Sequence, residues 1–363
     1  MFEKIIHYVQ GKREVIAGFH ECAPYMAAGT YIFDDSVKYI TRMEPDIKRK
    51  ASKILQKNEY KKRSTRLLIY LIKHTIFKKA LSITHNDILD QEFIGNVYLP
   101  VGSTNGYKDK KIFDLENNKI LTVFSEQKHY QSVLTNFEYF KEYFPMPAIL
   151  STNEHKNLII EDLIFFYPVN QWEEEDFLFL MGDVFDRYYH YFSDCKIKGS
   201  YSSTTTPALL EGLPECQEVE FIRNQINPDL WEVDFPTLKL HGDLWVANTL
   251  LIKGKKNQVK YIDWEFSSEL FFFYDFFNMM WLDVYMKERY FYINRYVKGE
   301  YDQQLKRLFS VFDLVFEPQY RMNYFHLFFL NFFKERLVHF AEGDKQAYFQ
   351  QYKWLVEAVE PEI

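Results

Sequence analysis

One segment of 30 residues, 237–266, constrains the fold of this chain more than any other. It reads TLKLHGDLWVANTLLIKGKKNQVKYIDWEF. A short apolar run ends before His241–Gly242–Asp243, which has the composition of a turn. The residues NTLLI, GKKN and QVKYI then have the pattern of a β-hairpin. This pattern predicts that the carboxylates of Asp243 and Asp263 and the carboxamide of Asn248 meet at one end of a short hairpin.

Such a set of side chains suits phosphoryl transfer from a nucleotide to a hydroxyl group. Mg²⁺ prefers oxygen ligands and neutralises charge on the phosphates, and Asn248 and Asp263 can supply those ligands. A separate carboxylate must accept the hydroxyl proton, and Asp243 is placed for that role. We expect His241 to hold the loop through hydrogen bonds. The alternative is structural: Asp243 would cap a turn and Asp263 would end a strand.

The segment resembles the aminoglycoside phosphotransferase and choline kinase group of the protein-kinase-like superfamily. The resemblance is carried by HGDLWVAN at 241–248 and IDWE at 262–265. It implies that Asp243 is the catalytic base, that Asn248 and Asp263 bind magnesium, and that His241 is structural. Asp275, in YDFFN, resembles a later aspartate of the family that steadies the catalytic loop.

The resemblance also implies the reaction and its cofactors. Members of this group use a nucleotide, ATP or GTP, with Mg²⁺ to phosphorylate a hydroxyl of a small molecule. We therefore expect an ATP-dependent phosphotransferase whose acceptor is a sugar or glycan, an amino alcohol or an aminoglycoside. The close match covers about 40 residues, and the order of the structural elements extends it more loosely.

The elements before the segment follow the order expected of two lobes. From about Phe93, short β-rich runs alternate with turn clusters, which is typical of a small antiparallel sheet. A helical run at 126–144 and a short strand follow, and the chain is then mostly helical. We predict an α+β, two-lobed protein-kinase-like fold, with a nucleotide-binding lobe at 91–165 and a larger helical lobe at 166–363. Residues 1–90 are predicted to form a helical, basic N-terminal extension.

The phosphate side of the nucleotide site is predicted from its small residues. Gly102 and Ser103 begin a turn in which backbone N–H groups could approach phosphate, although such turns are also common in plain hairpins. The family places a lysine in the next strand, where this chain has Thr122. Lys111 is the substitute that we expect, with Lys110 and Lys119 as the alternatives, and Glu138 is its expected partner. Either side chain could instead be solvated.

The base side of the same site falls on the strand NLIIEDLIFF. The resemblance places the adenine-binding hinge at Glu161 and Asp162, where the backbone of 162–164 would contact the base. Thr122 motivates an alternative function, a pseudokinase that binds nucleotide or a partner without turnover.

Charge is distributed unevenly along the chain. Between Arg42 and Lys79 there are 13 Lys and Arg residues against three acidic residues, a local net charge of +10 in a chain whose total is −7. An amphipathic basic helix is predicted around 66–81. The basic side chains of this helix can be interpreted as an ordinary solvated helix face. The alternative is that 42–79 contacts an anionic membrane or polymer. The remaining chain is acidic, so nucleic acid is not expected as a partner.

The remaining features bear on location and on the acceptor. Three widely spaced cysteines indicate a reducing compartment, so a cytoplasmic protein is expected, with the basic region able to place it at the inner face of the membrane. The aromatic-rich tail is interpreted as a buried helical core, with an aromatic cage for a quaternary ammonium as the alternative. The acidic run at 173–176 is interpreted as the start of a helix.

Overall fold

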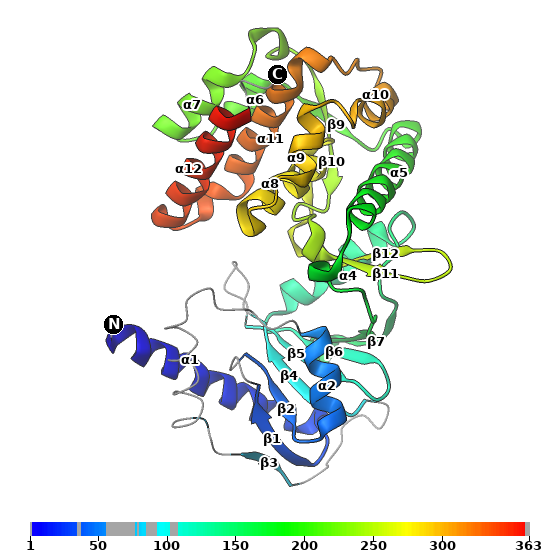
Figure 1. The fold of residues 1–363 in the computed structure, drawn as a ribbon, viewed down its shortest axis with the longest axis vertical. Coiled ribbons are helices and arrows are strands. Elements are labelled where there is room, and N and C mark those ends of the chain that lie inside the picture. Colours follow the sequence, from blue (N-terminus) through cyan, green and yellow to red (C-terminus); the bar gives the residue numbers. More distant parts are fainter. Residues whose placement is uncertain are drawn as a thin grey trace. The chain divides into compact units, whose positions relative to one another are not determined.

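The computed structural model describes residues 2–34, 38–55, 77, 80–84, 93–101 and 108–359. Two compact units make up the chain (Figure 1). The first, which we name the sheet unit, comprises Met1–Thr135 and Met146–Pro168. The second, the helical unit, comprises Asn136–Pro145 and Val169–Ile363.

The sheet unit is built on one antiparallel sheet. Its strands follow the order β3-β1-β2-β4-β5-β6-β8-β7, and the pairing of every neighbouring strand is antiparallel. The strands are β1 (Gly29–Phe33), β2 (Ile40–Arg42), β3 (Leu81–Ile83), β4 (Val97–Pro100), β5 (Lys110–Asp114), β6 (Lys119–Val123), β7 (Ile149–Asn153) and β8 (Leu158–Asp162).

Helices pack against both faces of this sheet. Successive residues of a strand point to opposite faces. Tyr98 and Ile112 therefore share a core with Phe19 of α1 (Phe2–Glu21) on one face of the sheet. The apolar residues next to them along β4 and β5 point to the other face and share a second core with α2 (Pro45–Ile54). A third helix, α4 (Gln127–Phe140), packs its first turns on Phe124 and Ile159.

The N-terminal 90 residues are less helical than the sequence predicted. They contain α1 and α2 but also the short strands β1, β2 and β3, and β2 pairs with β4 through Thr41 and Val97. These strands form because their alternate residues, such as Tyr31, join the core beneath α1. The amphipathic helix predicted around 66–81 lies almost wholly outside the described residues. The division of the chain at 90 and 165 stays a prediction.

The helical unit combines eight helices with five short strands among the described residues. In the sheet of three strands, β10 lies between β13 and β9, and β11 and β12 form a separate hairpin. The strands are β9 (Ser202–Thr204), β10 (Phe235–Leu240), β11 (Thr249–Ile252), β12 (Gln258–Tyr261) and β13 (Ser268–Phe271). The helices are α5 (Glu174–Lys198), α6 (Thr206–Leu210), α7 (Gln217–Gln225), α8 (Tyr274–Lys287), α9 (Phe291–Val297), α10 (Asp302–Val311), α11 (Arg321–Glu335) and α12 (Glu342–Val359).

The aromatic tail forms the core of this unit, as predicted. In α8 every residue from Tyr274 to Val284 is buried, and in α11 the run from Tyr324 to Phe333 is buried as well. The acidic run at 173–176 begins α5, where Glu173 and Asp176 form a reciprocal capping box. Within the described part of the chain, no helix has both the length and the apolar character needed to cross a membrane.

The structure has an antiparallel-sheet unit, a larger and mostly helical unit and a helix at the N-terminus. The α+β fold class is therefore confirmed.

Candidate active site

His241 follows β10 directly and is held on three sides. Its Nε2 lies 2.9 Å from the carbonyl oxygen of Ile262, which can only accept, so this nitrogen carries the ring proton. Its Nδ1 accepts the backbone N–H of Asp243 at 3.3 Å. The ring also lies 4.4 Å from that of Trp264. These contacts tie the turn to the chain just before Asp263, and the loop-holding role of His241 stays a prediction.

Gly242 occupies a position that other residues would not fit. Its φ is +77°, and a Cβ atom there would lie 2.3 Å from the carbonyl oxygen of Phe266. The turn can therefore close against the segment after Asp263 because residue 242 has no side chain.

Asp275 lies in the first turn of helix α8 and binds the backbone of the loop that contains His241 and Gly242. Its two carboxylate oxygens accept the backbone N–H groups of His241 at 2.9 Å and Gly242 at 3.0 Å. It also accepts a hydrogen bond from the hydroxyl of Tyr188 in α5. Burial raises the pKa of Asp275, and these hydrogen bonds act against that effect. The structural role predicted for Asp275 is confirmed.

The β11–β12 hairpin brings Asn248 and Asp263 to the same end, as predicted. Thr249 pairs with Tyr261 at the open end of the hairpin. One residue further out, the N–H of Ile262 donates to the carbonyl oxygen of Asn248 at 3.1 Å. Asp263 then adopts the left-handed conformation, with φ of +62°, which aspartate tolerates better than most residues.

The carboxylate of Asp243 is partly buried and is held through both oxygens. Oδ2 accepts from Nδ2 of Asn248 at 3.0 Å, and Oδ1 lies 3.5 Å from Nη2 of Arg336. The side chain is 23% exposed. Burial raises the pKa of Asp243, the positive charge of Arg336 opposes this, and the nearby charge of Asp263 adds to it.

Asn248 and Asp263 have the chemistry of magnesium ligands. The Nδ2 of Asn248 donates both to the backbone oxygen and to the carboxylate of Asp243, at 2.8 Å and 3.0 Å. The amide oxygen of Asn248 must then face the other way, where it can bind a cation. Among the described residues no group of three or more His, Cys, Asp and Glu side chains could hold a metal by itself. Two oxygen ligands still fit Mg²⁺, which takes its remaining ligands from water and phosphate.

Lys111 lies directly opposite the position where a lysine was expected. In the β5–β6 pairing Lys111 is the partner of Thr122. Directly opposed residues of antiparallel strands point to the same face with Cβ atoms about 5 Å apart. Glu138 lies near the end of α4, where it is 64% exposed and pairs with Lys141 at 2.6 Å. Its predicted pairing with Lys111 stays a prediction.

The rest of the predicted nucleotide site is described only in part. Gly102 and Ser103 lie outside the described residues. Glu161 and Asp162 end β8, next to β6. The N–H groups of Asp162 and Leu163 donate to the carbonyl oxygens of Ala148 and Asn118, at 3.0 Å and 2.9 Å. Because these two donors are already engaged, a bound base would need other backbone groups of this stretch.

The sequence did not reveal two residues that complete the site. Tyr188 precedes its partner Asp275 by 87 positions, and Arg336 follows Asp243 by 93. In the sequence, Tyr188 is one of many aromatic residues of a helix, and Arg336 looks like a common basic residue at a helix end. No local pattern could have found either one.

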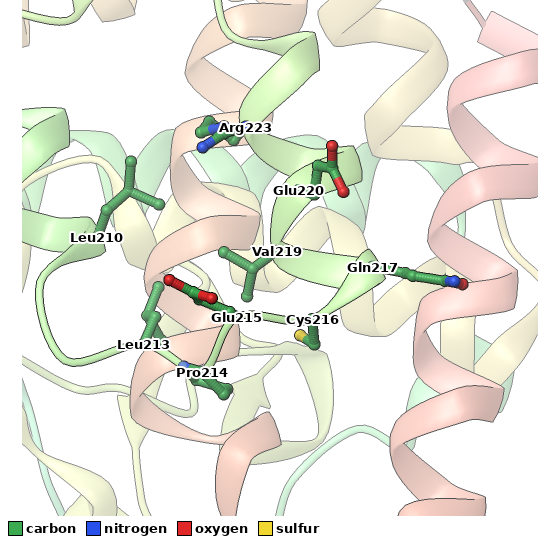
Figure 2. A pocket seen from close by; sticks show the side chains of 9 residues that line it. All are labelled: Leu210, Leu213, Pro214, Glu215, Cys216, Gln217, Val219, Glu220 and Arg223. Carbon is green, nitrogen blue, oxygen red and sulfur yellow. The ribbon is translucent and has the colours of Figure 1, made fainter.

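A separate cavity of about 530 Å³ lies beside the α6–α7 connection (Figure 2). Its lining includes Leu213, Cys216 and Val219. None of the predicted site residues lines it, so the candidate active site does not depend on this cavity.

Comparison with known proteins supplies structural neighbours but no family. No protein-family model matches the chain, and no curated protein matches its sequence significantly. Solved structures that match it include choline kinases and aminoglycoside phosphotransferases, the group that the sequence resembles.

Three of these structures illustrate the likeness. Choline kinase LicA from Streptococcus pneumoniae matches with a TM-score of 0.43 and 13% identity, over 73% of this chain and 93% of that one. A thermostable mutant of aminoglycoside phosphotransferase APH(4)-Ia, with ADP and hygromycin B, matches with a TM-score of 0.42 and 13% identity, over 72% and 93%. Amicoumacin kinase hAmiN, with AMP-PNP and Ca²⁺, matches with a TM-score of 0.40 and 10% identity, over 72% and 88%. At this level the likeness carries no information on the acceptor.

Proposed function

We propose that this protein transfers the γ-phosphoryl group of ATP to a hydroxyl group of a small molecule. The observation that carries the proposal is the arrangement around Asp243. Its carboxylate is positioned by Asn248, at one end of the hairpin that also delivers Asp263. A turn that only needed a cap would not require three oxygen-bearing side chains at one place, each held by its own local structure.

The chemistry follows from the position of each group. The acceptor hydroxyl donates its proton to the carboxylate of Asp243 as its oxygen attacks the γ-phosphorus. The new O–P bond forms while the bond between the γ-phosphorus and the bridging oxygen breaks, and ADP leaves. Asn248 and Asp263 would hold Mg²⁺, which neutralises charge on the phosphates when bound. Lys111 is the cation that we propose for the phosphates, because it lies opposite Thr122 on the same face of the sheet.

We propose an amino alcohol, a sugar or glycan, or an aminoglycoside as the acceptor. The partly buried carboxylate of Asp243 favours an alcohol, since a neutral hydroxyl can reach it without adding a charge to a partly desolvated place. Contact of 42–79 with an anionic surface stays a separate prediction. The part of it that the structure describes includes α2, where Arg49 and Lys53 are exposed and Ile47 and Ala51 face the core.

The test is magnesium-dependent turnover of ATP across a panel of these acceptors, with wild type beside Asp243→Asn. Loss of the base should lower the rate about 100- to 10,000-fold. Asp302→Asn is the matched control, because Asp302 is a similarly buried carboxylate, 17% exposed and paired with an arginine. It should leave turnover unchanged.

The alternative, a pseudokinase, predicts a different result. Binding of ATP and Mg²⁺ without turnover of any acceptor would support it. Turnover that is equally fast in Asp243→Asn would refute the role of Asp243.

A further inference from the structure

Arg336 contacts both segments that form the candidate active site. Its Nη1 donates to the carbonyl oxygen of Gly242 at 3.1 Å, and its Nη2 lies 3.5 Å from Oδ1 of Asp243. The guanidinium also lies over the ring of Phe266, 3.9 Å from its centroid. Phe266 is three residues after Asp263, so one side chain touches the turn at 242–243 and the segment that follows the hairpin.

The backbone places Arg336 where its side chain can reach this turn. Arg336 directly follows α11 as its C-terminal cap, and its N–H still donates to the carbonyl oxygen of Phe332 at 2.9 Å. Its φ and ψ, −126° and −58°, leave the helix at that residue. The side chain is 16% exposed. A charge held this far from water is costly unless it is paired, and its pairing partner here is Asp243.

Arg336 and Asn248 each contact a different oxygen of the Asp243 carboxylate. Asn248 donates to Oδ2, and the guanidinium lies at Oδ1. A carboxylate on a single Cβ–Cγ bond turns freely unless both oxygens are engaged. The planar fork of arginine suits this, because two of its N–H groups can meet two acceptors in a fixed geometry.

We propose that Arg336 is a positioning residue for Asp243, which fixes the carboxylate and the Gly242 carbonyl in the orientation that the attacking hydroxyl requires. This inference rests on the proposed function and adds to it a residue that lies outside the resemblance in the sequence. Arg336 acts through Asp243 and takes up no proton itself.

The first experiment compares kcat and KM for ATP in wild type, Arg336→Met and Arg336→Lys, with an acceptor that the wild type turns over. If the Asp243 carboxylate is no longer held in position, kcat of Arg336→Met should fall about 10- to 100-fold. KM for ATP should stay within about twofold of the wild-type value. Arg336→Lys should recover part of the loss in kcat, because lysine keeps the positive charge. The recovery should be incomplete, because lysine lacks the two planar N–H donors of the guanidinium. Added guanidinium ion should raise kcat of Arg336→Met and should have no such effect on Asp243→Asn.

Arg321→Met is the matched control. Arg321 begins the same helix, is also 16% exposed and is paired with a carboxylate, Asp302, away from the site. Its replacement should leave kcat unchanged. A kcat of Arg336→Met within about threefold of wild type, or an equal loss in Arg321→Met, would overturn the proposal.

A second measurement does not need turnover, so it separates this inference from the proposed function. Removal of Arg336 leaves the carboxylate of Asp243 with Asn248 but without its positively charged partner. The drop in Tm on Arg336→Met should therefore be smaller in an Asp243→Asn background than in wild type. The drop on Arg321→Met should be the same in both. Equal drops on Arg336→Met in the two backgrounds would overturn the pairing even if no acceptor is ever found.

Discussion

Replacement of Gly242 by alanine tests the geometry of the catalytic turn most directly. The residue has φ of +77°, and a Cβ would lie 2.3 Å from the carbonyl oxygen of Phe266. That oxygen belongs to the backbone, so it cannot rotate away as the end of a flexible side chain could. Gly242→Ala must therefore move either the turn or the segment after Asp263.

The cost has two parts. An L residue in the left-handed region costs about 1–2 kcal/mol. If the turn moves, the bond from the Gly242 N–H to Asp275, 3.0 Å long, is stretched or lost, and a buried group left without its partner costs about 1–3 kcal/mol. Together these lower the free energy of unfolding by about 2–5 kcal/mol.

The assay is urea unfolding followed by tryptophan fluorescence. All six tryptophans of the chain lie in the helical unit, so the signal reports the part that contains the turn. Gly212→Ala is the control, because Gly212 has φ of +79° but nothing within 4 Å of an added Cβ. Gly212→Ala should therefore lower the free energy of unfolding only by the cost of an L residue in the left-handed region, about 1–2 kcal/mol.

The difference between the two variants measures the effect of the Phe266 carbonyl. If Gly242→Ala destabilises the protein no more than Gly212→Ala does, the close approach of the two segments is refuted. Turnover should also fall in Gly242→Ala and stay unchanged in Gly212→Ala.

Two further predictions concern buried carboxylates of α8. Asp275→Asn should lower the free energy of unfolding by about 2–3 kcal/mol, because an amide can accept only one of the two backbone N–H groups that the carboxylate accepts; a loss below about 1 kcal/mol in urea unfolding would contradict this. Burial raises the pKa of Asp283 from 3.8 to about 6, so the folded chain holds this proton more tightly than the unfolded chain does. Its contribution to stability should therefore fall as pH rises from about 4 to about 6, by up to about 3 kcal/mol. Thermal unfolding of wild type and Asp283→Asn across this range should show that the variant gains stability relative to wild type as pH rises, and a constant difference would contradict the assignment.

Local sequence was enough to predict the hairpin end of the site. Asp243, Asn248 and Asp263 span only 21 residues, and the strands and turn between them follow period-two alternation and turn composition. Once β11 and β12 pair, Asn248 and Asp263 are brought together by the register itself. The same local signals predicted β4, β5, β6 and α4, and the burial of α8 and α11 followed from their aromatic density.

Contacts between distant segments had no such signal. The strands β1 to β3 form because they pair with one another, because β2 pairs with β4, and because their buried residues pack under α1. Tyr188 and Arg336 join the site because the packing of α5 brings Tyr188 to Asp275 and the packing of α11 brings Arg336 to Asp243.

The sequence by itself therefore determined which side chains carry the proposed chemistry, because Asn248 and Asp263 flank one hairpin whose hydrogen bonds are local and Asp243 lies in the turn five residues before Asn248. Asn248 holds one oxygen of the Asp243 carboxylate through a local contact, and the tertiary structure alone decided the contact at the other oxygen. That contact comes from Arg336, 93 residues away, and long-range packing of that kind leaves no periodic trace in the chain.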